Sequence, residues 1–394
     1  MMKKRLGTLA LAACMAVSML AGCSAFGGNS GTAAVQQQKA EDTKAENDKT
    51  ENTQAEESKT GDAAAPAKSD LKVALVLNGT KGDMAVMDSA ANGIELAKQQ
   101  FGIEGDVYEA GWERTKWEST MYDVCDSGKY DVVITGMFDM VDIVTKVSKE
   151  YPDIDFIQYD ALVDYADGEN TNVYSMQYKY NEGAFLAGYI AASSTESKKL
   201  GALGAMSVPA VNDFLLGYKA GIEYKDSAIP LQIKYADSFN DSTLGKELSL
   251  LMYNDGCDIV ANCAAVSGLG VIDAAKEVGK KCISTDSDMA MAFKDTDPEK
   301  ADTIIVSVQK RIDQSIVRAL DLYIKGELPL GQGETLGMAE GTIELTKNEY
   351  YDKYVPQDLQ KEVDEIAGKI LSGEIQIPSA YELTIDEIKS TLGL

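Results

Sequence analysis

The sequence contains no histidine, and none of its six cysteines form the C-x-x-C spacing of a metal site. Without histidine, Ser-His-Asp and Cys-His hydrolases are excluded, and so are zinc, iron and copper sites with His ligands. We therefore expect no resident metal, and we also expect no cofactor. A two-carboxylate mechanism needs no histidine, so our expectation that the chain is not an enzyme does not rest on this absence.

The sequence also has far fewer basic than acidic residues. The chain has 37 Lys and Arg residues against 63 Asp and Glu residues, which gives a net charge of −26. Such a field repels the phosphates of nucleic acids and the headgroups of anionic lipids. We expect no nucleic-acid partner and no contact of the folded surface with a membrane.

The N-terminus carries the pattern of a bacterial export signal. A basic start (MMKKR) precedes an apolar run from residue 6 to 20, shorter than the ~20 apolar residues that span a bilayer. The run ends in Leu-Ala-Gly-Cys, which resembles a lipobox, where the cysteine is acylated after cleavage in front of it. We predict that residues 1–22 are a lipoprotein signal peptide and that Cys23 anchors the chain to the extracytoplasmic face of the cell membrane. A plain secretory signal with an unmodified Cys23 is the alternative.

Residues 24–70 consist mainly of Ala, Glu, Lys, Thr, Gln and Asp, with few large apolar side chains. Such a segment cannot bury enough surface to offset the entropy of ordering it. The lipidated Cys23 and the residues up to 70 are therefore predicted to form a disordered tether.

Four cysteines remain beyond the tether: Cys125, Cys257, Cys263 and Cys282. Three of them lie near apolar, strand-like runs, which favours buried free thiols. A disulfide between two of them is the alternative, and spacing alone does not decide between the two states.

From residue 71 onward, short apolar runs alternate with segments of helical periodicity. The runs lie at 73–77, 132–134, 156–159, 173–176, 200–203, 233–235, 259–260, 282–283 and 303–308. This alternation is typical of parallel sheets covered by helices on both faces. The roughly 320 residues exceed what one core usually holds. We therefore expect two α/β lobes, each a doubly wound parallel sheet, joined by a hinge.

The first set of strand signals ends near residue 176, where we place the break between the lobes. Lobe 1 is predicted to contain residues 71–176 and about 309–335, and lobe 2 residues 177–308 and about 336–394. Lobes of this kind bind ligands at the carboxyl ends of their strands. The cleft between the lobes is the expected ligand site.

The folded part contains several distinctive motifs. They are 151–160 (YPDIDFIQYD), 181–188 (NEGAFLAG), 209–214 (PAVNDF), 217–221 (GYKAG), 238–241 (SFND), 267–271 (SGLGV), 286–288 (DSD) and 307–311 (SVQKR). In this order they resemble the basic membrane protein family, the lipid-anchored, PnrA-like substrate-binding proteins of ABC importers. The resemblance covers about residues 71–378. It implies a type I periplasmic-binding-protein fold, a monomer, ABC permease subunits as partners, and a nucleoside, mostly a purine one, as the ligand.

The resemblance also implies a set of ligand contacts. The residues at or beside the matching positions are Asp83, Met87, Phe138, Asp160, Phe214, Gly268, Asp286 and Lys310. Asp286 and Lys310 match positions that grip the ribose, and a carboxylate can accept two hydrogen bonds from vicinal hydroxyls. Asp160 resembles the acid that meets the edge of the base, and Phe214 the ring that stacks on it.

Four of these positions have a structural alternative. Asp83 and Asp286 are placed to cap the helical turns that follow them. Phe214 lies on the apolar face of its own predicted helix, and Lys310 has the alternative of an ordinary surface lysine. Gly268 opens a helix after a strand, where a backbone without a side chain can approach a ligand.

One stretch departs from the family pattern. Where the family places phenylalanines, this chain has Val86 and Met87, and Met84 replaces a lysine. A thioether can contact the edge of a ring, so Met87 is one candidate for the second face of the base. Trp112 or Phe138 from a neighbouring loop is another, and a ligand other than a purine is the third possibility.

The predicted function is the capture of a small neutral ligand, with a purine nucleoside first, for an ABC importer. Three acids around one lysine would leave a phosphate uncompensated, so nucleotides should be rejected. The alternatives are a sugar- or polyol-binding protein, a ligand sensor of the same fold, and a hydrolase in which Asp160 and Asp286 cleave a glycosidic bond.

Overall fold

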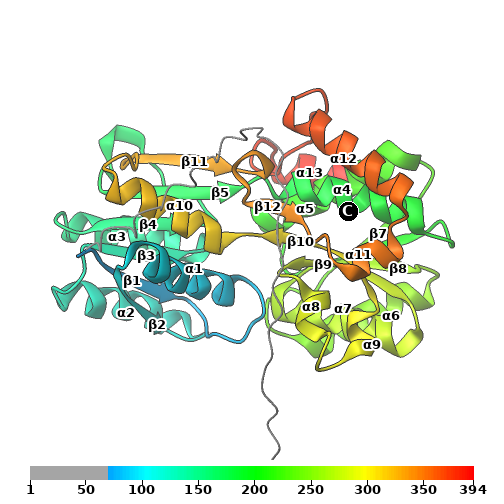
Figure 1. The fold of residues 1–394 in the computed structure, drawn as a ribbon, viewed down its shortest axis with the longest axis horizontal. Helices are drawn as coiled ribbons and strands as arrows, with labels where there is room; N and C mark the ends of the chain where they lie inside the picture. Colours follow the sequence, from blue (N-terminus) through cyan, green and yellow to red (C-terminus); the bar gives the residue numbers. More distant parts are fainter. Residues whose placement is uncertain (1–69) are drawn as a thin grey trace, which may run out of the picture. The chain divides into compact units, whose positions relative to one another are not determined.

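The computed structural model describes residues 70–394, which form two α/β lobes (Figure 1). Each lobe is built on a six-stranded sheet. The predicted pair of parallel-sheet lobes is confirmed. The predictions for the signal peptide, for Cys23 and for the tether up to residue 69 lie outside the described residues.

Lobe 1 has the strand order β11-β5-β4-β3-β1-β2, with parallel pairing throughout. Its strands are β1 (Lys72–Leu77), β2 (Glu104–Glu109), β3 (Val132–Gly136), β4 (Asp155–Tyr159), β5 (Val173–Tyr178) and β11 (Gln332–Leu336). Its helices are α1 (Val86–Phe101), α2 (Arg114–Asp126), α3 (Val141–Glu150) and α10 (Ile312–Ile324), with the 3₁₀ turns η1 (Phe138–Met140) and η2 (Ala166–Gly168). Helix α10 packs on α1, so the chain returns to this lobe after passing through lobe 2.

Lobe 2 has the strand order β12-β10-β9-β8-β6-β7, in which β12 pairs antiparallel with β10 and the other pairs are parallel. Its strands are β6 (Leu200–Gly204), β7 (Leu231–Tyr235), β8 (Ile259–Cys263), β9 (Lys281–Asp286), β10 (Ile304–Lys310) and β12 (Ile343–Leu345). Its helices are α4 (Tyr180–Ser194), α5 (Pro209–Asp226), α6 (Ser242–Asn254), α7 (Ala265–Val278), α8 (Met289–Phe293), α9 (Pro298–Ala301), α11 (Glu349–Tyr354), α12 (Gln357–Leu371) and α13 (Ile385–Leu392).

Strand β1 shows why an uninterrupted apolar run forms a central strand. Val73, Leu75 and Leu77 join the apolar cluster that contains α1, whereas Ala74 and Val76 join the one that contains α2 and α3. Successive side chains of a strand point to opposite faces of the sheet. A strand that is covered on both faces therefore needs apolar residues at every position.

Three strands of the structure, β2, β11 and β12, do not correspond to any of the apolar runs that predict strands. All three strands lie at the edge of a sheet. The sequence of β2, EGDVYE, contains no buried residue. An edge strand is held by hydrogen bonds on one side and faces solvent on the other, so its sequence needs no apolar run.

Within residues 70–394 the chain passes between the lobes after β5, after β10 and after β11. These crossings lie side by side. The N–H of Lys179 donates to the carbonyl of Leu336, and the N–H of Arg311 to that of Thr342, both at 2.8 Å. Lys310, the last residue of β10, therefore lies at the junction of the two lobes.

Helices α4 and α5 pack closely because glycines face the contact. A Cβ atom on Gly221 would lie 1.9 Å from the carbonyl oxygen of Phe185, and one on Gly217 would lie 2.2 Å from that of Asn181. Any side chain at these two positions would push the helices apart. Both glycines belong to the GYKAG motif, so part of the family signal in the sequence records helix packing.

Buried Asp213 on α5 joins three segments of lobe 2. Its Oδ2 accepts the N–H of Asn181 in the first turn of α4 at 2.9 Å. Its Oδ1 accepts the hydroxyl of Ser379 at 2.7 Å and the N–H of Ala380 at 2.9 Å. Asn181 Nδ2 also donates to the carbonyl of Pro378 at 3.1 Å. The segment between α12 and α13 is thereby held against α4 and α5.

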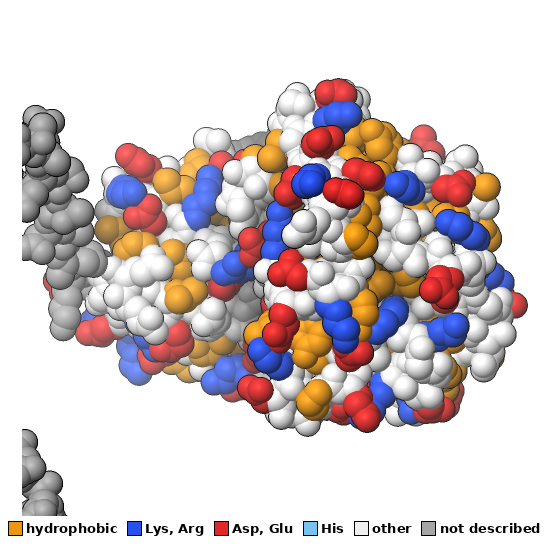
Figure 2. All heavy atoms as spheres, turned by 45° about the vertical axis from the view of Figure 1, so that its right-hand side comes forward, with side chains coloured by type: hydrophobic (Ala, Val, Ile, Leu, Met, Phe, Trp, Pro, Cys, Tyr) orange, Lys and Arg blue, Asp and Glu red, His pale blue; other side chains and the backbone are white. Residues whose placement is uncertain are grey.

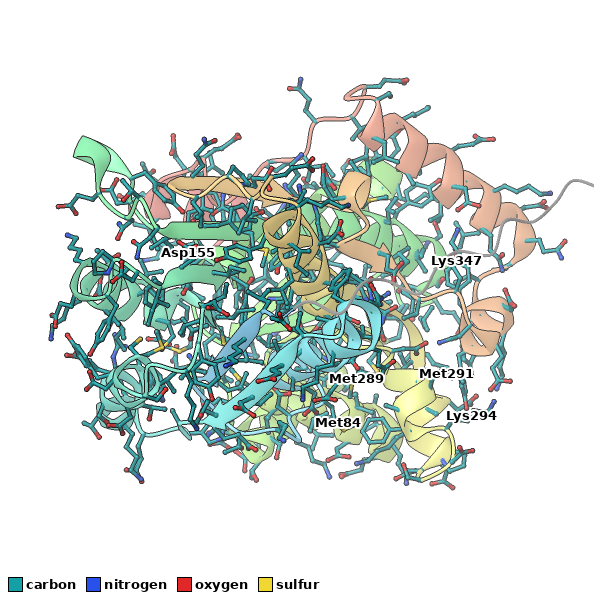
Figure 3. The ribbon with its side chains drawn as sticks, turned by 60° about the vertical axis from the view of Figure 1, so that its left-hand side comes forward. Met84, Asp155, Met289, Met291, Lys294 and Lys347 are labelled. Atoms are coloured by element: carbon teal, nitrogen blue, oxygen red, sulfur yellow. The ribbon has the colours of Figure 1, made fainter. Side chains whose placement is uncertain are left out.

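The surface of lobe 2 carries exposed ion pairs. Lys294, directly after α8, pairs with Glu349, and Lys347 pairs with Asp364, both at 2.6 Å. Figure 3 labels the two lysines. Figure 2 shows acidic, basic and hydrophobic side chains interspersed over one face. Exposed pairs of this kind contribute little to stability. Among the helices of residues 70–394, none combines the length and the apolar character needed to cross a bilayer.

The four cysteines of the folded part are buried and unpaired, which confirms free thiols over a disulfide. Burial raises the pKa of Cys282 to about 12, with a small opposing effect of Thr303. A thiol with so high a pKa carries almost no thiolate at neutral pH and is unreactive.

Asp213 makes the stability of the fold depend on pH. Burial raises its pKa from 3.8 to about 6, although Ser379 and two backbone N–H groups oppose the shift. Between these values the folded chain holds a proton that the unfolded chain has lost. The contribution of Asp213 to the free energy of unfolding should therefore fall as the pH rises from about 4 to 6, by about 3 kcal/mol for two pKa units.

We expect Asp213→Asn, which cannot titrate, to be least stable relative to the parent at pH 4.5 and to approach it at pH 7. Urea unfolding of both proteins across this range measures the difference. A difference that stays constant, or that grows with pH, would contradict the assignment.

Candidate functional site

A cavity of about 620 Å³ lies between the lobes. Its walls include residues from loops at the carboxyl ends of strands in both sheets. Asn78 follows β1, Met137 follows β3 and Asp160 follows β4 in lobe 1, while Met206 follows β6 and Ser238 follows β7 in lobe 2. Parallel sheets place ligands at these ends, and the volume suits a small organic molecule.

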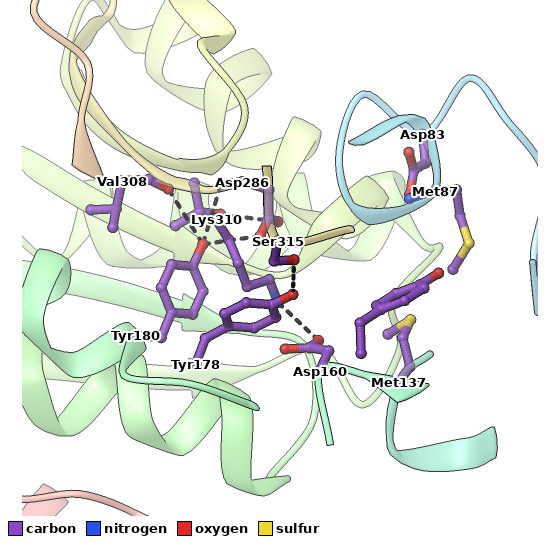
Figure 4. A network of polar contacts seen from close by, with 12 residues as sticks. Asp83, Met87, Met137, Asp160, Tyr178, Tyr180, Asp286, Val308, Lys310 and Ser315 are labelled. Carbon is purple, nitrogen blue, oxygen red and sulfur yellow. Dashed lines mark hydrogen bonds and ion pairs between the residues drawn. The ribbon is translucent and has the colours of Figure 1, made fainter. Parts of the chain in front are cut away.

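Four polar side chains meet in the cavity wall beside the crossings: Asp160, Tyr180, Asp286 and Lys310 (Figure 4). We call them the polar cluster. Lys310 Nζ lies 2.9 Å from Asp160 Oδ2, and each side chain is 6% exposed. The Tyr180 hydroxyl donates to Asp286 Oδ1 at 3.0 Å. Asp160 belongs to lobe 1 and the other three residues to lobe 2, so the cluster bridges the lobes.

The charges of the cluster keep Lys310 protonated. Burial lowers the pKa of Lys310, but the carboxylates of Asp160 and Asp286 outweigh burial and hold the pKa above its ordinary value. Burial also raises the pKa of Asp160, against the pull of Lys310. One cation between two acids can bind neutral hydroxyl groups, whereas a phosphate would meet uncompensated carboxylates.

Two buried acceptors in the wall have no hydrogen-bond partner among residues 70–394: Asp160 Oδ1 and Asn78 Oδ1. A buried acceptor left without a partner costs about 1–3 kcal/mol. Buried polar atoms are normally paired for this reason. Hydroxyl or N–H groups of a ligand could donate a hydrogen bond to each of these two oxygens.

Other parts of the wall are apolar and aromatic. Trp112 and Phe138 line the cavity and are 41% and 36% exposed. Phe138 of lobe 1 contacts Phe239 of lobe 2, with the ring centroids 6.4 Å apart. Val86 and Met87 line the cavity as well. All three candidates for the second face of a base, Met87, Trp112 and Phe138, are thus present in the wall.

Backbone strain gathers at the same loops. Met137, Asp160, Ala265 and Asp286 line the cavity, and their φ angles lie between 47° and 69°. This left-handed conformation costs a residue with a side chain roughly 1–2 kcal/mol. Such strain persists where the surrounding structure enforces it, and it concentrates at ligand sites. Four further residues with positive φ, Met84, Asn170, Lys198 and Asp237, do not line the cavity, so the strain accompanies the wall without being confined to it.

Six of the predicted ligand contacts line the cavity: Asp83, Met87, Phe138, Asp160, Asp286 and Lys310. Their contact with a ligand stays a prediction. Asp83 also accepts the N–H groups of Ala85, Met87 and Asp88 at 2.9–3.1 Å, so the alternative of a helix cap is present in the structure.

The other two predicted contacts, Phe214 and Gly268, are not among the residues that line the cavity, and their contact with a ligand also stays a prediction. Phe214 is fully buried and packs on Tyr180 and Tyr218, with ring centroids 5.3 and 6.0 Å away. Its face of α5 turns toward the core, as in the packing alternative. A Cβ atom on Gly268 would lie 2.5 Å from Asn262 Oδ1, so this glycine makes room for Asn262.

Sequence reasoning missed Asn78, Tyr180 and Tyr381, which line the cavity. Asn78 had a signal, since it is the polar residue directly after an apolar strand. Tyr180 begins α4 and looks like part of its apolar face. Tyr381 lies in an irregular segment whose position no periodicity reveals.

The family described as ABC transporter substrate-binding protein, PnrA-like, matches residues 70–380. The chain belongs to this family. Basic membrane protein A2 of Borrelia garinii subsp. bavariensis is 32% identical to this PnrA-like protein over 325 residues, which cover 80% of this chain and 91% of that one. The ABC transporter nucleoside-binding protein BmpA of Lactococcus lactis subsp. cremoris is 28% identical over 331 residues, or 79% of this chain and 90% of that one.

A solved structure has the same fold. The ABC transporter solute-binding protein from Aeropyrum pernix K1 superposes on this PnrA-like protein with a TM-score of 0.70 and 25% identity, covering 81% of this chain and 96% of that one. The predicted basic membrane protein family and the role of an ABC-transporter substrate-binding protein are confirmed. The family is one of binding proteins rather than enzymes.

The position of Trp112 depends on Gly79. A Cβ atom on Gly79 would lie 2.9 Å from the Trp112 ring, whose Nε1 donates to the hydroxyl of Thr80 at 3.2 Å. We expect Gly79→Ala to displace the ring and to weaken binding of a ligand that stacks on it about threefold to tenfold, the worth of one aromatic contact. Isothermal titration calorimetry measures the change.

Gly368→Ala on α12 is the matched control, because no atom lies within 4 Å of its Cβ position. It should leave affinity unchanged and stabilise the helix by about 1 kcal/mol. Equal affinities of Gly79→Ala and the parent would show that the Trp112 ring does not touch the ligand.

Proposed function

We propose that this protein captures a purine nucleoside in the cavity and delivers it to the permease of an ABC importer. The polar cluster carries the proposal, because it gathers two carboxylates and a lysine in a cavity whose wall also holds the aromatic side chains of Trp112, Phe138 and Phe239. Such a cavity offers hydrogen bonds to a sugar and stacking surfaces to a base.

The polar cluster is suited to the ribose. Tyr180 donates to Oδ1 of Asp286, and the Thr285 hydroxyl lies 3.5 Å from Oδ2. A carboxylate oxygen has two lone pairs, so Oδ2 can also accept a sugar hydroxyl. Lys310 spends one of its three donors on Asp160 and can offer the others. Because Asp160 is paired with Lys310, we place its free oxygen at the ribose as well, rather than at the edge of the base.

The aromatic part of the wall is suited to the base. Asn78, whose oxygen has no partner among the described residues, is followed by Gly79, and Gly79 packs against Trp112. An N–H group at the edge of a purine stacked on Trp112 can therefore donate to Asn78. Phe138 and Phe239 extend the apolar surface from both lobes.

The name of the Lactococcus relative, a nucleoside-binding protein, supports the same cargo here. Closure of the two lobes about the crossings would trap the ligand. We further propose that the protein acts as a monomer, held outside the cell membrane by the lipid on Cys23, and recognises ABC permease subunits when loaded.

A free sugar or polyol is the second candidate. The polar cluster taken alone favours it, since Asp160, Asp286 and Lys310 would serve the hydroxyls of a pentose equally well. The aromatic residues weigh against it, because a pentose has no aromatic ring to form a stacked pair with Trp112 or Phe138.

Asp286→Asn tests the proposal. An amide presents one acceptor and one donor where the carboxylate presents two acceptors, so the ribose loses a charge-assisted hydrogen bond. We expect inosine to bind about tenfold to hundredfold more weakly, the equivalent of roughly 1.5–3 kcal/mol. Calorimetric titration with inosine, adenosine, cytidine and ribose gives the affinities.

Asp155→Asn in lobe 1 is the matched control, because Asp155 accepts a hydrogen bond from Tyr323 and does not line the cavity (Figure 3). Its affinity should equal that of the parent. Binding of ribose without any nucleoside would replace the proposal by the sugar-binding alternative. Release of hypoxanthine from inosine would instead establish a two-carboxylate hydrolase.

The proposed anchor has its own test. Cys23→Ala should leave the chain unprocessed at this site or release it in soluble form, whereas the parent should remain with the membrane fraction. Mass spectrometry of the parent's N-terminus checks the modification. A mature parent that begins with an unmodified residue other than Cys23 would overturn the anchor and leave the binding proposal intact.

A further inference from the structure

The segment between α12 and α13 brings an aromatic residue from near the end of the chain to the cavity. Helix α12 ends at Leu371 and α13 begins at Ile385. Between them, Tyr381 contributes to the cavity wall. The family match ends at residue 380, so Tyr381 lies one residue beyond the part of the chain that it covers.

This segment is fixed by buried contacts. Asp213 accepts the hydroxyl of Ser379 and the N–H of Ala380, and Ala380 is 5% exposed. The N–H of Tyr381 donates to Ser379 Oγ at 3.3 Å. The backbone on the N-terminal side of Tyr381 is thus held against α4 and α5, so its ring is presented to the cavity by a rigid support.

The Tyr381 side chain lines the same cavity as the polar cluster. Burial raises the pKa of its phenol well above the ordinary value, and the carboxylates of Asp160 and Asp213 act in the same direction. Among residues 70–394 the structure shows no hydrogen bond to the Tyr381 hydroxyl. Asp160 Oδ1, in the same wall, is also without a partner there.

We propose that Tyr381 is a specificity-determining residue whose hydroxyl hydrogen-bonds one hydroxyl of the bound sugar beside Asp160. This inference rests on the proposed function. A phenol both donates and accepts, so it can bond a hydroxyl whose own proton goes to the carboxylate of Asp160. The rigid segment places this group without the entropy cost of ordering a loop on binding.

Tyr381→Phe removes the hydroxyl and keeps the ring. We expect inosine to bind about threefold to tenfold more weakly, as for the loss of one hydrogen bond between neutral groups. Each of 2′-, 3′- and 5′-deoxyinosine lacks one sugar hydroxyl. The analogue that lacks the hydroxyl bonded by Tyr381 should bind the parent and Tyr381→Phe equally well, because the hydrogen bond is absent in both complexes. Calorimetric titration of the parent and the variant with all four nucleosides provides the comparison.

Tyr351→Phe is the matched control. Tyr351 is 1% exposed, its hydroxyl has no partner among the described residues, and it does not line the cavity. Removing the Tyr351 hydroxyl should leave the affinities for inosine and the three deoxyinosines unchanged.

The outcomes separate this inference from the proposed function. If the parent binds inosine and Tyr381→Phe binds it equally well, the inference is wrong and the proposed function stands. If the variant loses the same factor for inosine and for every deoxyinosine, the ring rather than the hydroxyl contributes, which also overturns the inference. If the parent binds no nucleoside, both fail together.

Discussion

The buried ion pair between Asp160 and Lys310 is the interaction on which the site depends. Both side chains are 6% exposed, and they come from different lobes. Removing one partner from such a pair leaves a buried charge and typically costs about 3–5 kcal/mol. The pair therefore links the relative position of the lobes to the chemistry of the cavity. A ligand that bonds to Lys310 and to the free oxygen of Asp160 would strengthen a contact that spans both lobes.

The groups in the cavity wall are positioned by residues that never reach it. Phe214 packs on Tyr180, and Tyr180 in turn holds the carboxylate of Asp286. Asp213 holds the segment that presents Tyr381. Several wall residues have positive φ angles, and they too depend on the packing around them. Without that packing, the loops would relax to a backbone conformation of lower energy. A binding site that is rigid before the ligand arrives loses less entropy on binding.

Much of the fold could be predicted from the sequence, for a physical reason that also explains the misses. A central strand buried on both faces must be apolar throughout, and β1 is recognisable for that reason. Strand β2, at an edge, carries no such requirement and left no signal. Among the candidate contacts, Asp160 directly follows β4 and Asp286 is the last residue of β9. Both could be placed at the site because parallel strands end at one edge of the sheet.

The sequence by itself determined the fold class and the family, since strand burial leaves a local pattern and the glycine motifs record the close packing of α4 on α5. The tertiary structure decided which side chains face the cavity. Periodicity shows that one face of a helix is buried, but it does not show whether that face meets a core or a ligand. Phe214 lies on such a buried face, and the structure shows that this face meets the core. Tyr381 reaches the cavity from a segment that has no periodicity at all. Both positions depend on contacts between segments far apart in the chain.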